Sequence, residues 1–486
     1  MITQKSAEVI VAQRDRETYR HGEGPNISTR RSHITTEPLP PQGERCVWSD
    51  EVQPALSDNL FARIISSANV RQAWKRVKAN HGSAGVDGMS CEEFLSWSRA
   101  NWQIIRKSLE GRHYRPQPVL RVEIPKSNGG KRPLGIPTVC DRLIQQSILQ
   151  VLTPIFEPGF SDSSYGFRPN RSAHGALKQV RKLVEAGYQW VVDIDIEKFF
   201  DNVNHDILME RVARKVPDKQ TLKLIGRYLR AGVKVNGHVE STTKGTPQGG
   251  PLSPLLANVY LDVLDKELEK RGLNFVRYAD DMLIFVKSES AANRVMASVT
   301  RFIEKRLKLS VNRSKSAVRK VNQTTYLGFR FKGKKKIRII WSDESFKEFK
   351  CRVRQLTARS WFVSMRYRLR KLSEYVRGWM QYFGISQYYQ PIPLLDEWLR
   401  RRVRMCYLKQ WRLKRTRMNK LISLGVSRRK AKRFVFIDRG WWYLSKLYAA
   451  NWGMNNLWLH QQGLVCIRDI WVKIHYPDTP KLSFAP

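Results

Sequence analysis

The sequence predicts an α+β protein with two or three domains, on three observations. The chain has 486 residues, of which 42% are hydrophobic and 10% aromatic, so it can build sizeable cores. Short runs of β-branched, aromatic and aliphatic residues, such as Val276 to Tyr278 and Met282 to Val286, are typical of strands. Apolar residues at helical spacing, as from Leu60 to Val77, indicate amphipathic helices.

The charge of the chain points to a polyanionic partner. Lys and Arg number 87 against 43 Asp and Glu, a net charge of +44, which favours nucleic acid over the alternative of a basic membrane-surface protein. We find no apolar run long enough to span a membrane, no secretory leader and no lipidation signal. The six cysteines are scattered without a C-x-x-C pair, as in reduced cytosolic proteins, so we expect a cytoplasmic location.

The N-terminal part begins with a polar, Pro-containing stretch, residues 1–50, which we expect to be a flexible tail. After the helix predicted from Leu60, Val119 to Pro125 alternates like a strand, SNGG forms a turn, and RPLGIP resumes an extended path. The resulting basic hairpin carries Lys126 and Arg132 and is either a phosphate-binding flap or a solvated charged hairpin.

Two helices are predicted next. Leu143 to Phe156 reads as a buried helix, and Ala173 to Val184 as a periodic helix that begins after the Ser172 cap. The arginines of the RPNRS segment before that cap suit contact with a nucleic-acid backbone, although the same sequence is equally consistent with an ordinary capped helix.

Carboxylates line one face of the strand predicted in WVVDIDIEKFF. Alternation places Asp193, Asp195 and Glu197 on the face opposite Ile194 and Ile196, and such a strand could supply a metal ligand. The Gly/Pro-rich loop TPQGG and a helix follow it, and glycines of this kind permit close approach of the backbone to a ligand.

Asp280 and Asp281 lie at the tip of the hairpin predicted from Val276 to Val286. Two adjacent carboxylates repel each other, and a divalent cation such as Mg²⁺ removes that cost. The alternative is a solvated turn, because Asp is common in turns.

The C-terminal part is basic and helical. A helix is predicted from Ala291 to Leu309, followed by short strands with Lys315 between them. From Arg400 to Arg433 there are 15 Lys and Arg and no acidic residue, with aromatics interleaved, which suits phosphate neutralisation and base stacking better than a solvated basic face. The candidate RNA-binding residues are Arg400, Arg401, Arg402, Arg404, Lys409, Arg412, Lys414, Arg415, Arg417, Lys420, Arg428, Arg429 and Lys430.

Six sequence blocks occur in a specific order: IPKSNGGKRPLGIP, SYGFRPNRSAHGAL, DIEKFFDNVNHD, GTPQGGPLSPLLANVYLD, RYADDM and YLGF. With YVRGWMQYFG after them, the chain resembles the reverse transcriptase/maturase encoded within bacterial group II introns, from about residue 60 to the C-terminal region. The resemblance implies a right-hand polymerase of fingers, palm and thumb. Its expected parts are a tail (1–50), an N-terminal extension of the fingers (51–112), fingers and palm (113–335), a thumb or maturase domain (336–470) and a C-terminal tail (471–486).

The resemblance also implies roles for individual residues. Asp195, Asp280 and Asp281 match the catalytic aspartates that hold two Mg²⁺ ions, with the carbonyl of Ile196 as a further ligand and Asp193 as a structural neighbour. A second group would bind the dNTP, with Phe200 as the gate that excludes a ribose 2′-hydroxyl and Lys315 near the leaving pyrophosphate: Lys126, Arg132, Phe200, Gln248, Ala257 and Lys315.

The implied partners are the intron RNA, an RNA template with a DNA primer, target DNA and dNTPs, in a ribonucleoprotein associated with nucleoid DNA. An HNH endonuclease domain is not expected, as in the class C lineage. The alternatives are a non-catalytic splicing factor and a reverse transcriptase of a retron, diversity-generating or CRISPR-associated type. An RNA-dependent RNA polymerase is disfavoured by Phe200.

Overall fold

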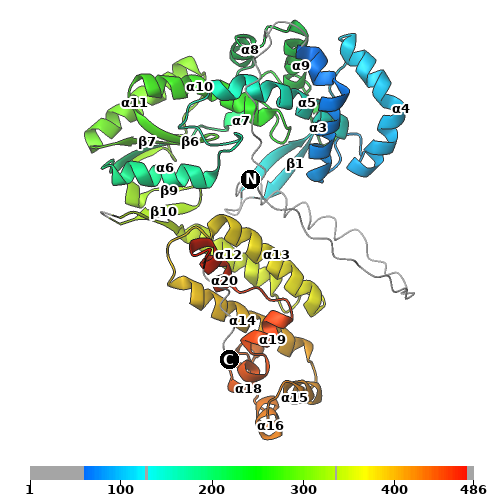
Figure 1. The fold of residues 1–486 in the computed structure, drawn as a ribbon, viewed down its shortest axis with the longest axis vertical. Coiled ribbons are helices and arrows are strands. Elements are labelled where there is room, and N and C mark those ends of the chain that lie inside the picture. The colour runs from blue at the N-terminus through cyan, green and yellow to red at the C-terminus, as the bar shows by residue number, and fades with distance from the viewer. Residues whose placement is uncertain (1–59, 126–129, 334–335, 479–486) are drawn as a thin grey trace.

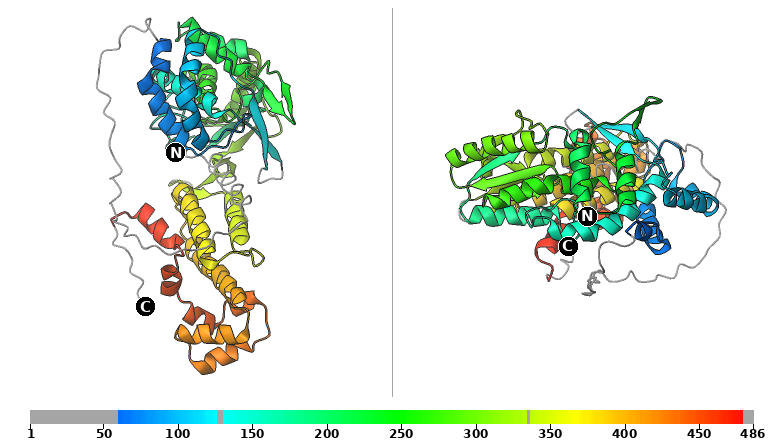
Figure 2. Two further views of the ribbon diagram at one scale, coloured as in Figure 1. Left: turned by 90° about the vertical axis from the view of Figure 1, so that its right-hand side faces the viewer. Right: turned by 90° about the horizontal axis from the view of Figure 1, so that it is seen from above.

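The computed structural model describes residues 60–125, 130–333 and 336–478, and Figures 1 and 2 show two lobes. The larger lobe combines helices and sheets, and the smaller lobe below it consists mostly of the helices that follow residue 341. The tail expected over residues 1–50 lies outside the described residues, as does Lys126.

Four helices form the N-terminal part: α2 (Leu60–Ile65), α3 (Ser67–Ala79), α4 (Cys91–Glu110) and α5 (Val139–Phe156). Of these, α3 and α4 pack on the start of α5, while α2 and the rest of α5 join the larger core. The single helix predicted from Leu60 to Val77 is in fact two, because Ser66 adopts an extended conformation and its hydroxyl accepts the N–H of Asn69 at 3.4 Å, which starts α3 anew.

The fingers contain a four-stranded sheet in the order β2-β1-β4-β5. Its strands are β1 (Val119–Pro125), β2 (Lys131–Ile136), β4 (Val233–Val235) and β5 (His238–Glu240). The first two pair antiparallel from Leu120↔Ile136 to Pro125↔Lys131, which is the predicted basic hairpin. Short helices η1 (Glu157–Gly159), α7 (Phe199–Asn202), α8 (His205–Ala213) and α9 (Lys219–Leu229) connect this region to the palm.

The palm is built on an antiparallel sheet in the order β6-β7-β3-β8. The strands are β3 (Trp190–Ile194), β6 (Asn274–Tyr278), β7 (Asp281–Val286) and β8 (Ala317–Lys320). Helix α6 (Ala173–Glu185) covers one face, while α10 (Ser253–Lys270) and α11 (Glu289–Arg306) cover the other (Figure 1). Because neighbouring strand residues point to opposite faces, Val191 packs with α6 and Val192 with the opposite layer.

A three-stranded sheet joins the palm to the thumb. It contains β9 (Thr325–Tyr326), β10 (Phe329–Lys332) and β11 (Arg338–Trp341), in the order β11-β10-β9, and the one-turn helix η2 (Val321–Gln323) precedes it. One hydrophobic core continues from Val276 and Leu283 of the palm through Phe329 to Leu372 and Val376 of the thumb.

Helices make up the thumb: α12 (Asp343–Leu356), α13 (Met365–Phe383), α14 (Pro391–Gln410), α15 (Lys414–Ser423), α16 (Arg428–Val435), α17 (Trp441–Leu444), α18 (Tyr448–Gly453), α19 (Asn456–Gln461) and α20 (Ile467–His475). The last helix runs across residue 470, where a tail was expected to begin. That boundary needs correction, because Trp471 is buried and its indole N–H donates to the Ser386 carbonyl at 2.8 Å. Within the described ranges, no helix is long and apolar enough to span a bilayer.

Candidate active site and nucleic-acid surface

The YADD segment forms the tight hairpin that the sequence predicts. Strands β6 and β7 pair as far as Tyr278↔Asp281, which leaves only Ala279 and Asp280 in the turn. Ala279 has φ 58°, a left-handed conformation that is costly for a residue with a side chain. Asp281 is the first residue of β7, so its carboxylate lies on a well-defined strand end.

The sheet register brings Asp195 to the same place. Strands β3 and β7 pair antiparallel down to Ile194↔Met282, and one further step along that register sets Asp195 beside Asp281. The backbone of Asp195 is fixed by the segment before β8: its N–H donates to the Ser316 hydroxyl at 3.0 Å, and its carbonyl accepts the Asn312 N–H at 2.8 Å.

Electrostatics indicate that the carboxylates act on one another through space. The pKa of Asp193 is raised to about 6, mainly by burial; the negative charges of Asp281 and Asp195 add to this rise, and the charge of Arg319 opposes it. The Arg319 guanidinium lies 3.5 Å from the Asp193 carboxylate. This end of the palm sheet is therefore a site of negative potential that favours a cation.

The donor chemistry at this site fits a divalent cation that is shared with a substrate. Within the described ranges, no three His, Cys, Asp or Glu side chains are arranged to hold a metal unaided. Mg²⁺, however, is usually bound by one or two carboxylates together with substrate phosphates and water. Ile196, the further expected ligand, pairs with Val311 in an isolated bridge, which holds its backbone next to Asp195.

A buried arginine supports the hairpin from behind, and the sequence analysis did not identify it. Arg277 is fully buried and forms a bidentate ion pair with the equally buried Asp265 of α10. Its remaining N–H groups donate to the Asn258 side chain at 3.0 Å and to the Ala279 carbonyl at 2.9 Å. The guanidinium therefore holds the strained residue of the turn.

The SSYGF segment also holds the hairpin in place. The Tyr165 N–H donates to the Arg277 carbonyl at 2.8 Å, and the Gly166 carbonyl accepts the Asn258 amide at 2.9 Å. A Cβ on Gly166 would lie 2.3 Å from the backbone nitrogen of Ala279, so only glycine permits this approach.

Two of the predicted nucleotide-binding residues are in direct contact. The Nε of Arg132 donates to the Gln248 side-chain oxygen at 3.2 Å, and the Gln248 carbonyl accepts the Gly135 N–H at 2.7 Å. The fingers hairpin and the TPQGG loop are thereby joined.

The other nucleotide-binding candidates differ in exposure. Phe200 is 8% exposed and stacks edge-on against Phe199 with 5.2 Å between ring centroids, whereas Ala257 is only 2% exposed, inside α10. The Thr246 N–H donates to the Phe200 carbonyl at 2.7 Å, which ties Phe200 to the TPQGG loop. Lys315 is largely exposed, and its Nζ lies 3.7 Å from the Asp195 carboxylate.

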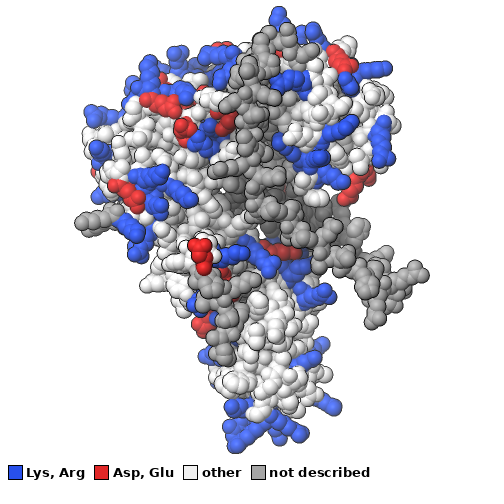
Figure 3. Space-filling model, in the orientation of Figure 1, with Lys and Arg blue, Asp and Glu red and all other residues white. Residues whose placement is uncertain are grey.

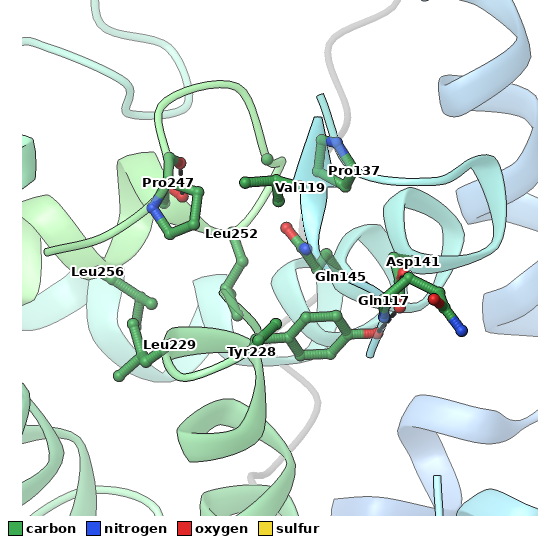
Figure 4. A pocket seen from close by; sticks show the side chains of 13 residues that line it. Gln117, Val119, Pro137, Asp141, Gln145, Tyr228, Leu229, Pro247, Leu252 and Leu256 are labelled. Atoms are coloured by element: carbon green, nitrogen blue, oxygen red, sulfur yellow. Dashed lines mark hydrogen bonds between the residues drawn. The ribbon is translucent and has the colours of Figure 1, made fainter. Parts of the chain in front are cut away.

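A small cavity beside the TPQGG loop is too small for a substrate. Figure 4 shows Asp141, Gln145 and Tyr228 around it, and its volume of about 20 Å³ holds no more than a single water. Asp141 accepts hydrogen bonds from the hydroxyls of Tyr114 at 2.7 Å, Thr138 at 2.8 Å and Tyr228 at 3.2 Å. The hydrogen bond from Tyr228 to Asp141 links α9 to α5.

The basic stretch from Arg400 to Arg433 divides into exposed and buried members. Lys and Arg gather at the lower tip of the thumb, around α15 and α16 (Figure 3), where the exposed candidates are Lys409, Arg412, Lys414, Arg415, Lys420, Arg428, Arg429 and Lys430. Arg400 is half-buried in α14, as are Arg401 and Arg402.

Two predicted RNA-binding arginines need correction, because they are buried. Arg404 is 6% exposed, and its Nε donates to the Met454 carbonyl at 2.8 Å. Arg417 is 7% exposed and lies over the Trp441 ring, 4.8 Å from its centroid. Both hold the thumb helices together and do not face a ligand.

Comparison with known proteins identifies two matching family models. Residues 124–331 match the model described as reverse transcriptase (RNA-dependent DNA polymerase), and residues 346–422 match the group II intron, maturase-specific domain. These matches confirm the predicted right-hand arrangement of fingers, palm and thumb.

Individual proteins are also similar to this chain. Protein YkfC of Escherichia coli (strain K12) is 35% identical over 61% of this chain and 87% of its own length. Group II intron-encoded protein LtrA of Lactococcus lactis subsp. cremoris is 41% identical over 43% of this chain, but the match spans only 35% of LtrA. Among solved structures, a partial Cas6-RT-Cas1–Cas2 complex covers 51% of this chain and 43% of its own matched chain at 25% identity, with a TM-score of 0.34.

Proposed function

The chain belongs to the group II intron-encoded reverse transcriptases, RNA-directed DNA polymerases with a maturase-specific domain, and we propose that Asp195, Asp280 and Asp281 carry its polymerase reaction. The observation that supports these residues most strongly is the register of β3 against β7, which sets Asp195 beside Asp281 at the end of the palm sheet.

The reaction is attack by a primer 3′-hydroxyl on the α-phosphate of an incoming dNTP, with pyrophosphate leaving in line. Enzymes of this family use divalent metal ions, and two bound Mg²⁺ ions would stabilise the attacking and leaving oxygens here. The three carboxylates would orient the reactants at the end of the palm sheet, and the carbonyl of Ile196 completes the proposed donor set.

The nucleotide pocket is proposed to lie between the fingers hairpin and the palm. Arg132, already positioned by Gln248, can contact the triphosphate in a bidentate manner, and Lys126 is the second residue proposed to contact it. Phe200 would face the sugar and disfavour a 2′-hydroxyl, and Ala257 is the second residue proposed to lie near the sugar. Lys315 contributes positive charge near the leaving pyrophosphate, since its Nζ is 3.7 Å from Asp195.

The maturase role rests on the thumb. The family match implies nucleic-acid partners that include intron RNA, and the exposed basic residues of α15 and α16 are the proposed surface for that RNA. The primer would be DNA and the integration partner target DNA. The proposed site of action is the bacterial cytoplasm, in association with nucleoid DNA.

The first test is single-nucleotide incorporation on an RNA template with a DNA primer. Asp281→Asn should lower the incorporation rate at least 100-fold, because one carboxylate that binds the metal ions is lost. The matched control is Asp343→Asn on α12, an exposed aspartate paired with Arg330 and remote from the palm carboxylates, which should keep the wild-type rate.

The same pair of variants separates the two activities. A well-folded Asp281→Asn protein should still bind intron RNA and support splicing, since its thumb is unchanged. If this variant incorporates nucleotides at the wild-type rate, the carboxylate assignment is wrong. If wild type itself supports splicing but never polymerises, the non-catalytic splicing factor is the better description.

A further inference from the structure

A basic and aromatic groove lies in the thumb, apart from the palm carboxylates, and shares Lys409 with the exposed basic surface around α15 and α16. It has a volume of about 890 Å³, within the range of about 300–1,000 Å³ typical of small-ligand sites. The end of α12, the loop that follows it, the middle of α14 and the short helix α17 form its walls.

The charge of this groove is of one sign. Arg354, Arg359, Arg402 and Lys409 line it, and among the described residues no acidic side chain does. Arg402 is engaged, since its Nε donates to the Thr357 hydroxyl at 2.9 Å, whereas Arg359 and Lys409 are exposed at the wall. Such a wall favours an anion with more than one charged group, as in a phosphodiester chain.

An aromatic side chain stands in the groove without a packing role. Phe362 is 95% exposed, although phenylalanine normally gains free energy by burial, and it borders the basic groove, where its ring is open to stacking by a base. Trp442 lines the same groove and is 36% exposed, and the Arg401 guanidinium lies 3.7 Å from its ring centroid. The groove therefore offers flat apolar surfaces next to cations.

The loop that presents Phe362 is held in place before any ligand arrives. Arg368 of α13 is 4% exposed and donates to the carbonyl of Leu356 at the end of α12 at 2.9 Å and to two carbonyls of the loop, Ala358 at 3.0 Å and Trp361 at 2.6 Å. Its guanidinium also lies over the Trp361 ring, 5.1 Å from the centroid. A preorganised loop loses little entropy on binding, which is what a stacking platform requires.

We propose that this groove binds a single-stranded nucleic-acid segment, with one unstacked base against Phe362 and the flanking phosphates on Arg359 and Lys409. Every base has a flat π face, so this recognition tolerates sequence and rejects a paired duplex whose bases are already stacked. The inference rests on the proposed nucleic-acid binding by the thumb, but it does not require the polymerase reaction.

The test is the affinity of the full-length chain for a 12-nucleotide RNA, a DNA of the same sequence and the corresponding RNA duplex, by fluorescence anisotropy. Stacking contributes about 1–3 kcal/mol per base, so Phe362→Ala should weaken single-strand binding roughly 5- to 150-fold and leave the duplex unchanged. Phe362→Trp should retain the affinity, which excludes misfolding as the cause. The control is Tyr388→Ala in the loop between α13 and α14, an exposed aromatic that is 44% accessible, which should have no effect.

Salt dependence separates the two parts of the groove. Phe362→Ala removes no charge, so the slope of log affinity against log salt should stay at its wild-type value. Arg359→Gln should reduce that slope by about 0.7, the value for one phosphate of a single strand. A 2-aminopurine placed in the RNA should be quenched by the wild type and not by Phe362→Ala, which reports stacking directly.

The outcomes are decisive in either direction. A selective loss of single-strand binding with RNA alone, or with RNA and DNA alike, supports the groove and identifies the strand that it accepts. Equal losses for single strand and duplex, or no loss at all, overturn it. If a poly-glutamate peptide displaces the single strand and binds more tightly, the groove serves an acidic protein and the proposal is wrong. Asp281→Asn should bind the single strand as wild type does, so failure of the catalytic assignment would leave this result intact.

Discussion

The buried pair of Arg277 and Asp265 permits a sharp test of how the catalytic hairpin is held. Both side chains are fully buried, and the same guanidinium also donates to the Ala279 carbonyl at 2.9 Å. Asp265→Leu would leave the arginine charge without its counter-ion, and removal of one partner from a buried pair typically costs about 3–5 kcal/mol. The free energy of unfolding, measured by urea denaturation, should fall by that amount.

The double variant Arg277→Met with Asp265→Leu distinguishes packing from positioning. A buried ion pair replaced by apolar residues of similar size is often neutral in stability, so most of the lost free energy should return. The Ala279 carbonyl would still lack its charged donor, a hydrogen bond of about 1.5–3 kcal/mol. We therefore expect nucleotide incorporation to stay about 10- to 100-fold below wild type at saturating dNTP.

The control is Glu210→Gln, which breaks an exposed pair with Arg214 on α8 and should cost no more than about 0.5 kcal/mol. Recovery of both stability and incorporation in the double variant would refute the positioning role, since packing alone would then suffice. A loss below about 1 kcal/mol in Asp265→Leu would show that water reaches the pair.

Three further predictions address other parts of the chain. Phe200→Val should raise the kcat/KM ratio of rNTP to dNTP, because space opens beside C2′; an unchanged ratio would remove Phe200 from the sugar gate. Reversal to Glu of four exposed thumb residues, Arg412, Lys414, Arg415 and Lys420, should weaken intron-RNA binding and flatten its salt dependence, with a smaller effect on single-nucleotide incorporation; an unchanged salt slope would place the RNA elsewhere. Burial, with the charge of Asp265, raises the pKa of Asp262 to about 6, above the unfolded value of about 3.9. The folded state therefore holds this proton more tightly, and wild type should lose stability as the pH rises from about 4 to about 6. Asp193 contributes in the same window, so Asp262→Asn should lose less stability than wild type does, and parallel stability curves for the two proteins across that range would contradict the shift.

Local sequence patterns predicted the elements that depend on short-range periodicity. The strands around Asp280 and Asp281 and the alternation along Trp190 to Ile194 follow from the two-residue period of a strand. The break at Ser66 was missed, because apolar residues continue at helical spacing on both sides of it. There a local hydrogen bond to the serine side chain outweighs the periodic pattern.

The buried arginines could not be identified from composition. A basic stretch without acids reads as a surface, yet Arg404 and Arg417 find their partners at Met454 and Trp441, far along the chain. Arg277 likewise depends on Asp265, whose position beside it is set by the packing of α10 on the sheet. One signal was available in the sequence: an arginine inside an apolar strand must have a buried acceptor.

The hydrophobic core that runs from the palm sheet into the thumb makes the two domains one cooperative unit. The Tyr382 hydroxyl of α13 donates to the Leu327 carbonyl at 3.0 Å, and the His174 ring of α6 contacts the Tyr382 carbonyl at 2.7 Å. A palm expressed without its thumb would expose Phe329, whose ring packs against Tyr382 and Phe383 of α13, and is expected to aggregate. Exchange of thumbs between such enzymes is therefore expected to require redesign of the palm surface that the thumb covers. Loss of the thumb in evolution would likewise require repacking of the polymerase core.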